Sequence, residues 1–157
     1  MKNILKVCKN GDTMAIQKIP IKVKILHADA KIPFLGTEHA AGFDIYSSED
    51  YELHVGETHA VATGIALEVP VGKVLFIWDR SGMGFKGIHR FAGVIDSDYR
   101  GELKIILCNH SKVNYKISKG DRIAQGVIQD YYTPEFEEVN ELSDTNRGAG
   151  GFGSTGK

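Results

Sequence analysis

Residues 147–157 combine a flexible backbone with side chains that bind phosphate. Five of these eleven residues are glycine, and ordering them would cost roughly 1 kcal/mol or more per residue. A ligand can offset that cost, because glycine lets backbone N–H groups approach oxyanions while Arg147, Ser154 and Thr155 add charge and hydroxyl donors. The ring of Phe152 is suited to stacking on a nucleobase. The segment predicts a lid that orders over a nucleotide polyphosphate.

Two other interpretations of this segment are a disordered Gly/Ser tail and a P-loop. Composition alone favours the tail, but Arg147 and Phe152 are not linker residues. Residues 151–157 also match the first seven positions of the G-x-x-x-x-G-K-[ST] pattern. That pattern needs a buried strand before it and a helix after it, and the sequence predicts neither here.

Residues 92–102 are the strongest internal candidate for chemistry. They read as a hairpin with an apolar entry, Gly93 to Ile95, and with acidic, aromatic and basic side chains at the tip. Asp96 directly follows the apolar pair, so we expect it to be partly buried, and a carboxylate held there could act as a base for water. The alternative is that the charged residues are solvated turn residues.

Three further segments carry polar side chains near strand ends, and each is a weak signal alone. Asp44 beside Gly42-Phe43 could simply cap a turn. Arg80 and Ser81 precede a short glycine turn and could hold phosphate, although a surface ion pair would explain the arginine as well. Gln125 lies in an apolar context where its amide needs a partner.

The elements that must position these residues are nearly all strands. Residues 19–25 alternate strictly, with isoleucine and valine on one face and lysine on the other. Similar runs cover 51–55, 58–69, 73–79, 103–109, 113–117 and 122–132. The best helical candidate, 82–86, contains two glycines and predicts one turn at most. The sequence predicts an all-β sandwich or jelly roll, with residues 1–18 as an extra hairpin or an arm.

Length and composition indicate one domain without a strong global field. The 157 residues can bury a real core, and 19 basic against 20 acidic residues give a net charge of −1. Two cysteines and six scattered histidines form neither a disulfide framework nor a zinc pattern. No signal peptide or transmembrane run is apparent, so we expect a cytoplasmic or other intracellular protein.

Taken in order, these segments resemble the five motifs of the trimeric dUTPase family (deoxyuridine triphosphate nucleotidohydrolases). The resemblance covers about residues 40–157, and five motifs in the right order are highly specific. The motifs are A-G-F-D at 41–44, R-S-G-M at 80–83, G-V-I-D-S-D-Y-R-G-E at 93–102, G-D-R-I-A-Q at 120–125 and R-G-A-G-G-F-G-S-T-G-K at 147–157.

The resemblance implies a jelly-roll subunit, a homotrimer with active sites at subunit junctions, and Mg²⁺-dependent cleavage of dUTP to dUMP and pyrophosphate. This reaction limits uracil incorporation into DNA and supplies dUMP. Stable binding to nucleic acid or membranes is not expected. The implied organisation is a single domain, 1–157, with an N-terminal extension (1–18), the jelly roll (19–142) and a flexible lid (143–157).

The resemblance also implies a role for each motif residue. Asp96 would be the catalytic base that activates water, Tyr99 would exclude a ribose 2′-hydroxyl, and Phe152 would stack on the base. Asp44 would contact Mg²⁺ only through water, with no direct protein ligand to the metal. The implied substrate-binding residues are Arg80, Ser81, Gly82, Ala92, Gly93, Val94, Ile95, Tyr99, Gln125, Arg147, Phe152, Gly153, Ser154 and Thr155.

Three positions depart from the family pattern. Asp79 replaces a common proline; it can point away from the phosphates, because neighbours on a strand face opposite sides, or it can pair with Arg80. Met83-Gly84 replaces the commoner Leu-Ala. Arg90 replaces an asparagine that contacts uracil in many relatives, which leaves the reading of uracil to backbone groups around Ala92 and Val94.

Two other functions remain open from the sequence. One is a dCTP deaminase-like enzyme on the same fold, although the complete fifth motif is typical of the diphosphatases. The other is a nucleotide-controlled protein that regulates a partner through residues 1–18 or another surface. Pyrophosphate release from dUTP, ammonia release from dCTP, or little of either would separate the three.

Overall fold

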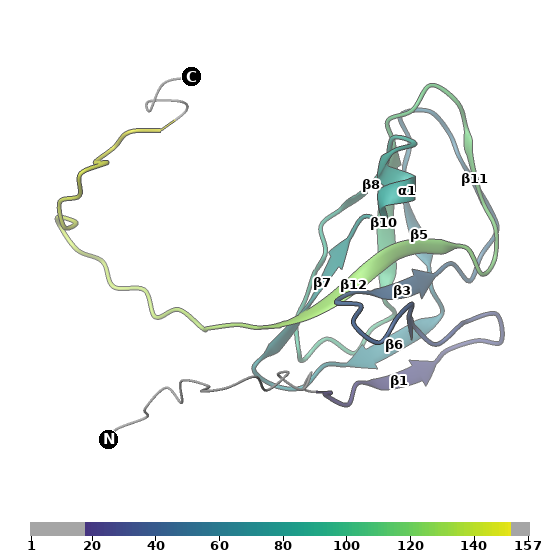
Figure 1. Cartoon of the computed structure of the whole chain (residues 1–157), viewed down its shortest axis with the longest axis horizontal. Coiled ribbons are helices and arrows are strands. Elements are labelled where there is room, and N and C mark those ends of the chain that lie inside the picture. Colours follow the sequence, from purple (N-terminus) through teal and green to yellow (C-terminus); the bar gives the residue numbers. More distant parts are fainter. Residues whose placement is uncertain (1–17, 152–157) are drawn as a thin grey trace, which may run out of the picture.

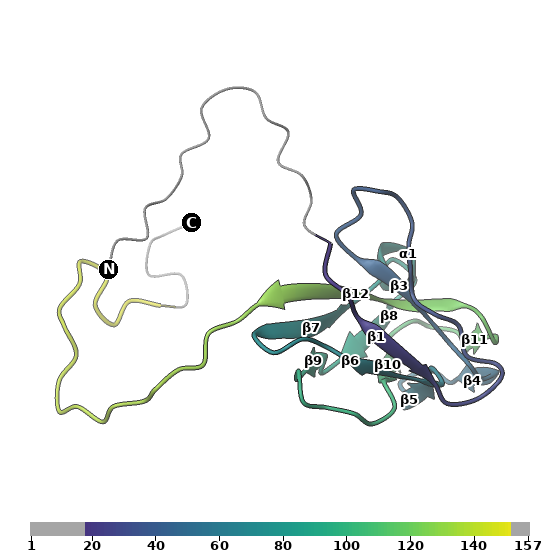
Figure 2. The same cartoon turned by 90° about the horizontal axis from the view of Figure 1, so that it is seen from below.

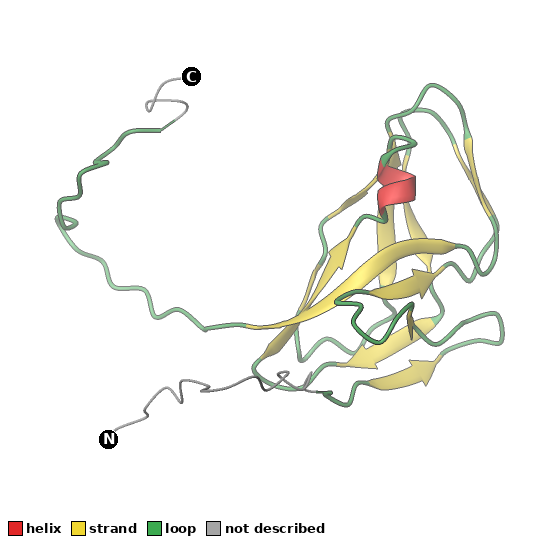
Figure 3. Cartoon of the chain, in the orientation of Figure 1, coloured by secondary structure: helices red, strands yellow, loops and turns green. Residues whose placement is uncertain are grey.

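Strands make up nearly all the regular structure in the computed structural model, which describes residues 18–151 (Figure 3). One helical turn, α1 (Ser81–Gly84), interrupts them, as predicted for residues 82–86. The all-β fold class is therefore confirmed. The strands are β1 (Lys22–Ile25), β2 (Phe34–Leu35), β3 (Phe43–Tyr46), β4 (Tyr51–Leu53), β5 (Thr58–Ala62), β6 (Ile65–Glu68), β7 (Lys73–Trp78), β8 (Ile88–Phe91), β9 (Val94–Ile95), β10 (Lys104–Asn109), β11 (Tyr115–Ile117) and β12 (Arg122–Asp130).

The described strands form four sheets around one core (Figures 1 and 2). The largest has the order β2-β3-β12-β7-β9, and β5-β10-β8, β1-β6 and β11-β4 form the others. All paired strands are antiparallel. Leu53, Ile65, Leu75 and Ile105 come from different sheets and are all fully buried in one cluster. The strand-like runs in the sequence thus predicted the positions of most of these strands.

Two predicted elements differ from the structure. The run 58–69 is two strands, because the chain turns at Gly64, where φ is +67° and a Cβ would lie 2.7 Å from the His27 ring. Residues 92–102 do not form a hairpin. β9 pairs with β7, whereas the next strand, β10, pairs with β5 and β8, so the strands on either side of this turn belong to different sheets.

Beyond β12 the chain leaves the sheets as an extended arm (Figure 1). Residues 131–149 are all exposed, and the arm carries no strand within the described part of the chain, although the alternating pattern had suggested strand up to residue 132. No helix between residues 18 and 151 is long and apolar enough to cross a membrane.

Asn109 ties three backbone groups into the core at the end of β10. Its Nδ2 donates to the carbonyls of Leu53 (3.0 Å) and Val113 (2.9 Å), and its Oδ1 accepts from the Ser111 N–H (2.9 Å). The side chain is fully buried. Truncation would leave buried backbone groups without partners, so Asn109→Ala should lower the free energy of unfolding by about 2–3 kcal/mol.

Urea unfolding checks this prediction, with Asn114→Ala as the matched control. Asn114 is exposed and its side-chain hydrogen bonds are long, at 3.3 and 3.5 Å. The control should change stability by less than about 0.5 kcal/mol. Equal effects of the two substitutions would contradict the role given to Asn109.

Candidate active site

Asp44, Arg80 and Gln125 gather on one face of the five-stranded sheet. Gln125 of β12 pairs with Asp44 of β3 on one side and with Trp78 of β7 on the other. Directly paired residues of antiparallel strands face the same side of a sheet. Arg80 follows β7 and reaches the same place, where its Nε donates to Asp44 Oδ1 at 2.9 Å. The first, second and fourth motifs are therefore adjacent.

A second arginine completes this cluster. Arg122 Nη1 donates to Asp44 Oδ2 (3.2 Å), and the Arg122 carbonyl accepts a hydrogen bond from Arg80 Nη1 (3.2 Å). Asp44 is buried, and a buried charge is costly unless it is paired. The guanidinium groups of Arg80 and Arg122 compensate its charge. The sequence patterns assign no role to Arg122, although its place three residues before Gln125 in the same motif is a signal for one.

The Asp44 pair fixes the Arg80 side chain and leaves donors free for a ligand. Arginine has five N–H donors in a planar fork, and among residues 18–151 Arg80 donates through two of its nitrogens, Nε and Nη1. Basic side chains outnumber acidic ones in the adjoining cleft, which suits a polyanion. This cleft is lined by Arg80, Gly82, Met83, Lys86, Tyr115, Lys116, Asp121 and Arg122.

Asp79 points away from Arg80. Its Oδ1 accepts the backbone N–H of Arg90 at 2.7 Å, and its Oδ2 lies 3.0 Å from His89 Nδ1. The sequence allowed Asp79 either to point away from the phosphates or to pair with Arg80. The structure has the first arrangement, as expected from the alternation of side chains along a strand. The departure from proline at this position leaves the Asp44–Arg80 contact intact.

Asp96 is exposed in the single chain, so the expectation that it is partly buried was wrong. Alternation along β9 explains the difference, because Ile95 is turned partly inward while Val94 and Asp96 are turned outward. A turn follows, in which the Tyr99 N–H donates to the Asp96 carbonyl at 3.2 Å. The Asp96 carboxylate is thus available to groups outside its own chain.

The Tyr99 ring is held in place over Gly101. Its hydroxyl donates to the Glu102 carbonyl at 3.0 Å, and a Cβ at Gly101 would lie 2.4 Å from that hydroxyl oxygen. Only glycine leaves room for the ring in this position. Tyr99 remains 46% exposed, so one side of the ring can contact a ligand.

One chain does not bring Asp96 next to Arg80. Ile95 pairs with Leu75, so Asp96 continues toward the level of Val74. Arg80 is six positions beyond Val74 and still has extended dihedrals, φ −80° and ψ 133°. At ~3.3 Å per residue the two residues are roughly 20 Å apart along β7. The third motif therefore lies apart from the cluster formed by the first, second and fourth.

The fifth motif is described only in part. Arg147 is exposed on the extended arm, where its Nε donates to the Gly150 carbonyl at 2.8 Å. The arm runs away from the sheets that carry Asp44 and Arg80 (Figure 1). The predictions for Phe152, Gly153, Ser154 and Thr155 lie outside the described residues.

The donor set near Asp44 suits a metal that brings its own ligands. Between residues 18 and 151 no three His, Cys, Asp or Glu side chains are grouped to hold an ion. Both carboxylate oxygens of Asp44 already accept hydrogen bonds from arginines. A Mg²⁺ ion that is bound mainly by phosphate oxygens and waters would fit such a site, because Mg²⁺ in proteins usually keeps several waters.

Comparisons with known proteins point to one family. The dUTPase family model matches residues 28–156. The chain is 49% identical over 140 residues to the deoxyuridine 5'-triphosphate nucleotidohydrolase of Nautilia profundicola, covering 87% of this chain and 99% of that protein. The structure of Staphylococcus bacteriophage 80alpha dUTPase with dUPNHPP is similar, with a TM-score of 0.84 and 32% identity over 88% of this chain and 99% of that one.

Another similar solved structure is described as containing a metal ion. A mutant dUTPase from phage phi11 of S. aureus, described with a coordinated structural Mg(II) ion, has a TM-score of 0.74 and 28% identity, covering 79% of this chain and 99% of that chain. The family match, the level of identity and the ordered motifs agree with one another. The chain belongs to the dUTPase family.

Proposed function

We propose that this chain hydrolyses dUTP to dUMP and pyrophosphate. The observation that carries the proposal is the Asp44–Arg80–Gln125 cluster, found in a chain that belongs to the dUTPase family. Relatives at 42–53% identity over most of the chain are dUTP nucleotidohydrolases by name. The related phage dUTPase was solved with a dUTP analogue, which supports dUTP as the substrate.

In the proposed reaction, Asp96 orients a water and removes its proton as the water attacks the α-phosphorus. A carboxylate oxygen can accept this proton directly, which is the role of a general base. Arg80, whose guanidinium is fixed by Asp44, would neutralise charge that develops on the phosphates. Ser81, Gly82, Gln125 and Arg147 are proposed as further phosphate ligands, together with Ser154 and Thr155 of the tail.

A divalent metal accompanies the triphosphate in this proposal, and we propose Mg²⁺. The structural Mg(II) ion of the phage phi11 dUTPase supports a metal in this fold. When bound, the ion would neutralise phosphate charge and orient the triphosphate. Asp44 would act on it only through water.

The active site is proposed to form between copies of the chain in a homotrimer. The separation of roughly 20 Å between Asp96 and Arg80 supports this, because one chain cannot place both on one nucleotide. Exposed apolar surface supports it too. The arm presents Tyr132, Phe136 and Leu142, which are 95%, 90% and 87% exposed.

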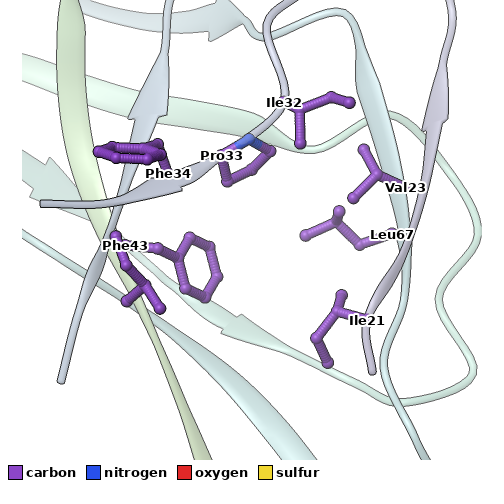
Figure 4. Close-up of a pocket in the computed structure, with 8 residues that line it drawn as sticks. Ile21, Val23, Ile32, Pro33, Phe34, Phe43 and Leu67 are labelled. Carbon is purple, nitrogen blue, oxygen red and sulfur yellow. The ribbon is translucent and has the colours of Figure 1, made fainter. Parts of the chain in front are cut away.

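An apolar cavity of about 390 Å³ adds to the surface that association could cover (Figure 4). The side chains that line it belong to β1 and β2, to the residues just before each of these strands, and to β3 and β6. They are Ile21, Val23, Ile32, Pro33, Phe34, Leu35, Phe43 and Leu67. In a single chain this cavity is open to water, which is unfavourable for so apolar a lining.

Tyr99 is proposed to exclude ribonucleotides by occupying the space of a 2′-hydroxyl. The hydrogen bond to Glu102 and the absence of a side chain at Gly101 keep its ring in one position. Wild type should therefore prefer dUTP to UTP strongly, and Tyr99→Ala should narrow the ratio of kcat/KM values by about tenfold or more. Equal kcat/KM for both substrates in the wild type would refute the assignment.

The test of the function is product analysis with dUTP and Mg²⁺. Stoichiometric dUMP and pyrophosphate would support the proposal. Ammonia released from dCTP would point to a deaminase, and little turnover of either nucleotide would point to a regulatory binding protein.

A further inference from the structure

The backbone bends sharply at Ala92 and Gly93, between β8 and β9. Ala92 has φ +59° and is the one non-glycine residue with a positive φ between residues 18 and 151. A side chain in this left-handed region costs roughly 1–2 kcal/mol. Gly93 follows with φ +115°, and a Cβ there would lie 3.0 Å from the Ile77 carbonyl oxygen. Such a bend persists only where the surroundings hold it.

Two hydrogen bonds fix consecutive carbonyls of the bend. The Ile77 N–H donates to the Gly93 carbonyl at 2.8 Å, and Arg90 Nη1 donates to the Ala92 carbonyl at 2.5 Å. In a trans peptide the C=O and the following N–H point in opposite directions. Holding the Ala92 carbonyl therefore sets the direction of the Gly93 N–H as well.

The next residue presents its backbone at an open edge of the sheet. Val94 pairs with Phe76, and its neighbour Gly93 is the residue bonded to Ile77. Bonded and non-bonded pairs alternate along an antiparallel ladder, so the Val94 N–H and C=O face away from β7. Since β9 is the last strand of its sheet among residues 18–151, these groups lie at an edge where they can bind a nucleobase.

Arg90 is itself fixed from two sides. Its guanidinium carbon lies 5.1 Å from the centroid of the Trp78 ring, and its backbone N–H donates to Asp79 Oδ1 at 2.7 Å. The Arg90 Nε is buried without a hydrogen-bond partner among the described residues. Trp78 and Asp79 directly precede Arg80. One short segment therefore contributes to the Asp44–Arg80–Gln125 cluster and also holds Arg90 beside the bend.

We infer that Arg90 is a positioning residue for the backbone that reads the base. This inference rests on the proposed function and adds a residue to it. Uracil and cytosine differ in the groups on their pairing edge, since O4 accepts a hydrogen bond where the cytosine N4 amine donates one. A backbone held in one orientation can discriminate between them, whereas a loose bend cannot.

Steady-state kinetics of Arg90→Met tests the inference. Methionine keeps much of the apolar stem and removes the donors and the charge. KM for dUTP should rise about 10- to 100-fold, as expected when a charged donor is lost, and the preference for dUTP over dCTP should fall. The effect on kcat should be smaller. Lys112→Met, at an exposed site away from the bend, should leave every parameter unchanged.

Arg90→Lys provides the second variant in case the methionine variant does not assemble. Lysine keeps the charge but not the planar fork, so KM should again rise, by less than in Arg90→Met. A folded Arg90 variant with wild-type KM and wild-type base preference would overturn the inference. If the wild type itself does not hydrolyse dUTP, the proposed function fails instead, so the two failures are distinguishable.

Discussion

Asp96→Asn is expected to lower kcat for dUTP about 10²–10⁴-fold, the contribution typical of a general base. Asparagine keeps the shape of the side chain and cannot accept the proton from water. Binding should persist, because the proposed phosphate and base contacts come from other residues. Pyrophosphate release measures the first effect, and calorimetric titration with a non-hydrolysable dUTP analogue measures the second.

Asp98→Asn is the matched control for this substitution. Asp98 is an exposed aspartate two residues along the same turn, and it has no proposed role in the reaction. Its turnover should stay near the wild-type value. Wild-type turnover in Asp96→Asn, or an equal loss in both variants, would refute the assignment of Asp96 as the base.

Deletion of residues 147–157 should lower kcat by orders of magnitude and leave the fold intact. The segment supplies Arg147, Ser154 and Thr155 as proposed phosphate donors and Phe152 as the proposed stacking residue. Phe152→Ala should cause part of the loss, through about 1–3 kcal/mol of stacking. The melting temperature should change little, because in the described part of the chain the Arg147 side chain bonds to Gly150 of its own segment and residues 131–149 are exposed.

Removal of residues 1–17 is the control for that truncation. They lie before the region, 28–156, that matches the family model, so turnover should be retained. A C-terminal truncation with full activity would contradict the catalytic role of the tail. A large drop in melting temperature would mean that the segment acts through stability.

Local patterns predicted much of the fold and part of the candidate site. Period-two alternation identified most strands. It also gave the correct alternative for Asp79, whose side chain points away from Arg80 because neighbours on a strand face opposite sides. The order of the motifs predicted that Asp44, Arg80 and Gln125 would share a site, and the sheet order β3-β12-β7 brings them together. These features depend on neighbours along a strand or on motif order, and both are readable from a sequence.

The features that were missed depend on pairing between distant segments. A hairpin would pair Val94 and Ile95 with the residues that follow them, but in the structure they pair with β7. The order of strands in a sheet decides this pairing, and alternation along one strand does not encode that order. The same applies to Arg122, whose contact with Asp44 spans two neighbouring strands. The exposure of Asp96 is a property of the single chain, and its proposed partners belong to another copy.

We propose that dUTP is hydrolysed at a site that takes Arg80 from one copy and Asp96 from another. Co-expression of Arg80→Ala with Asp96→Asn tests it most directly. Each variant alone should be nearly inactive. In randomly mixed trimers about one site in four would combine an intact Arg80 with an intact Asp96, so we expect recovery of about a quarter of wild-type dUTP turnover. Mixed assemblies as inactive as the separate variants would contradict it.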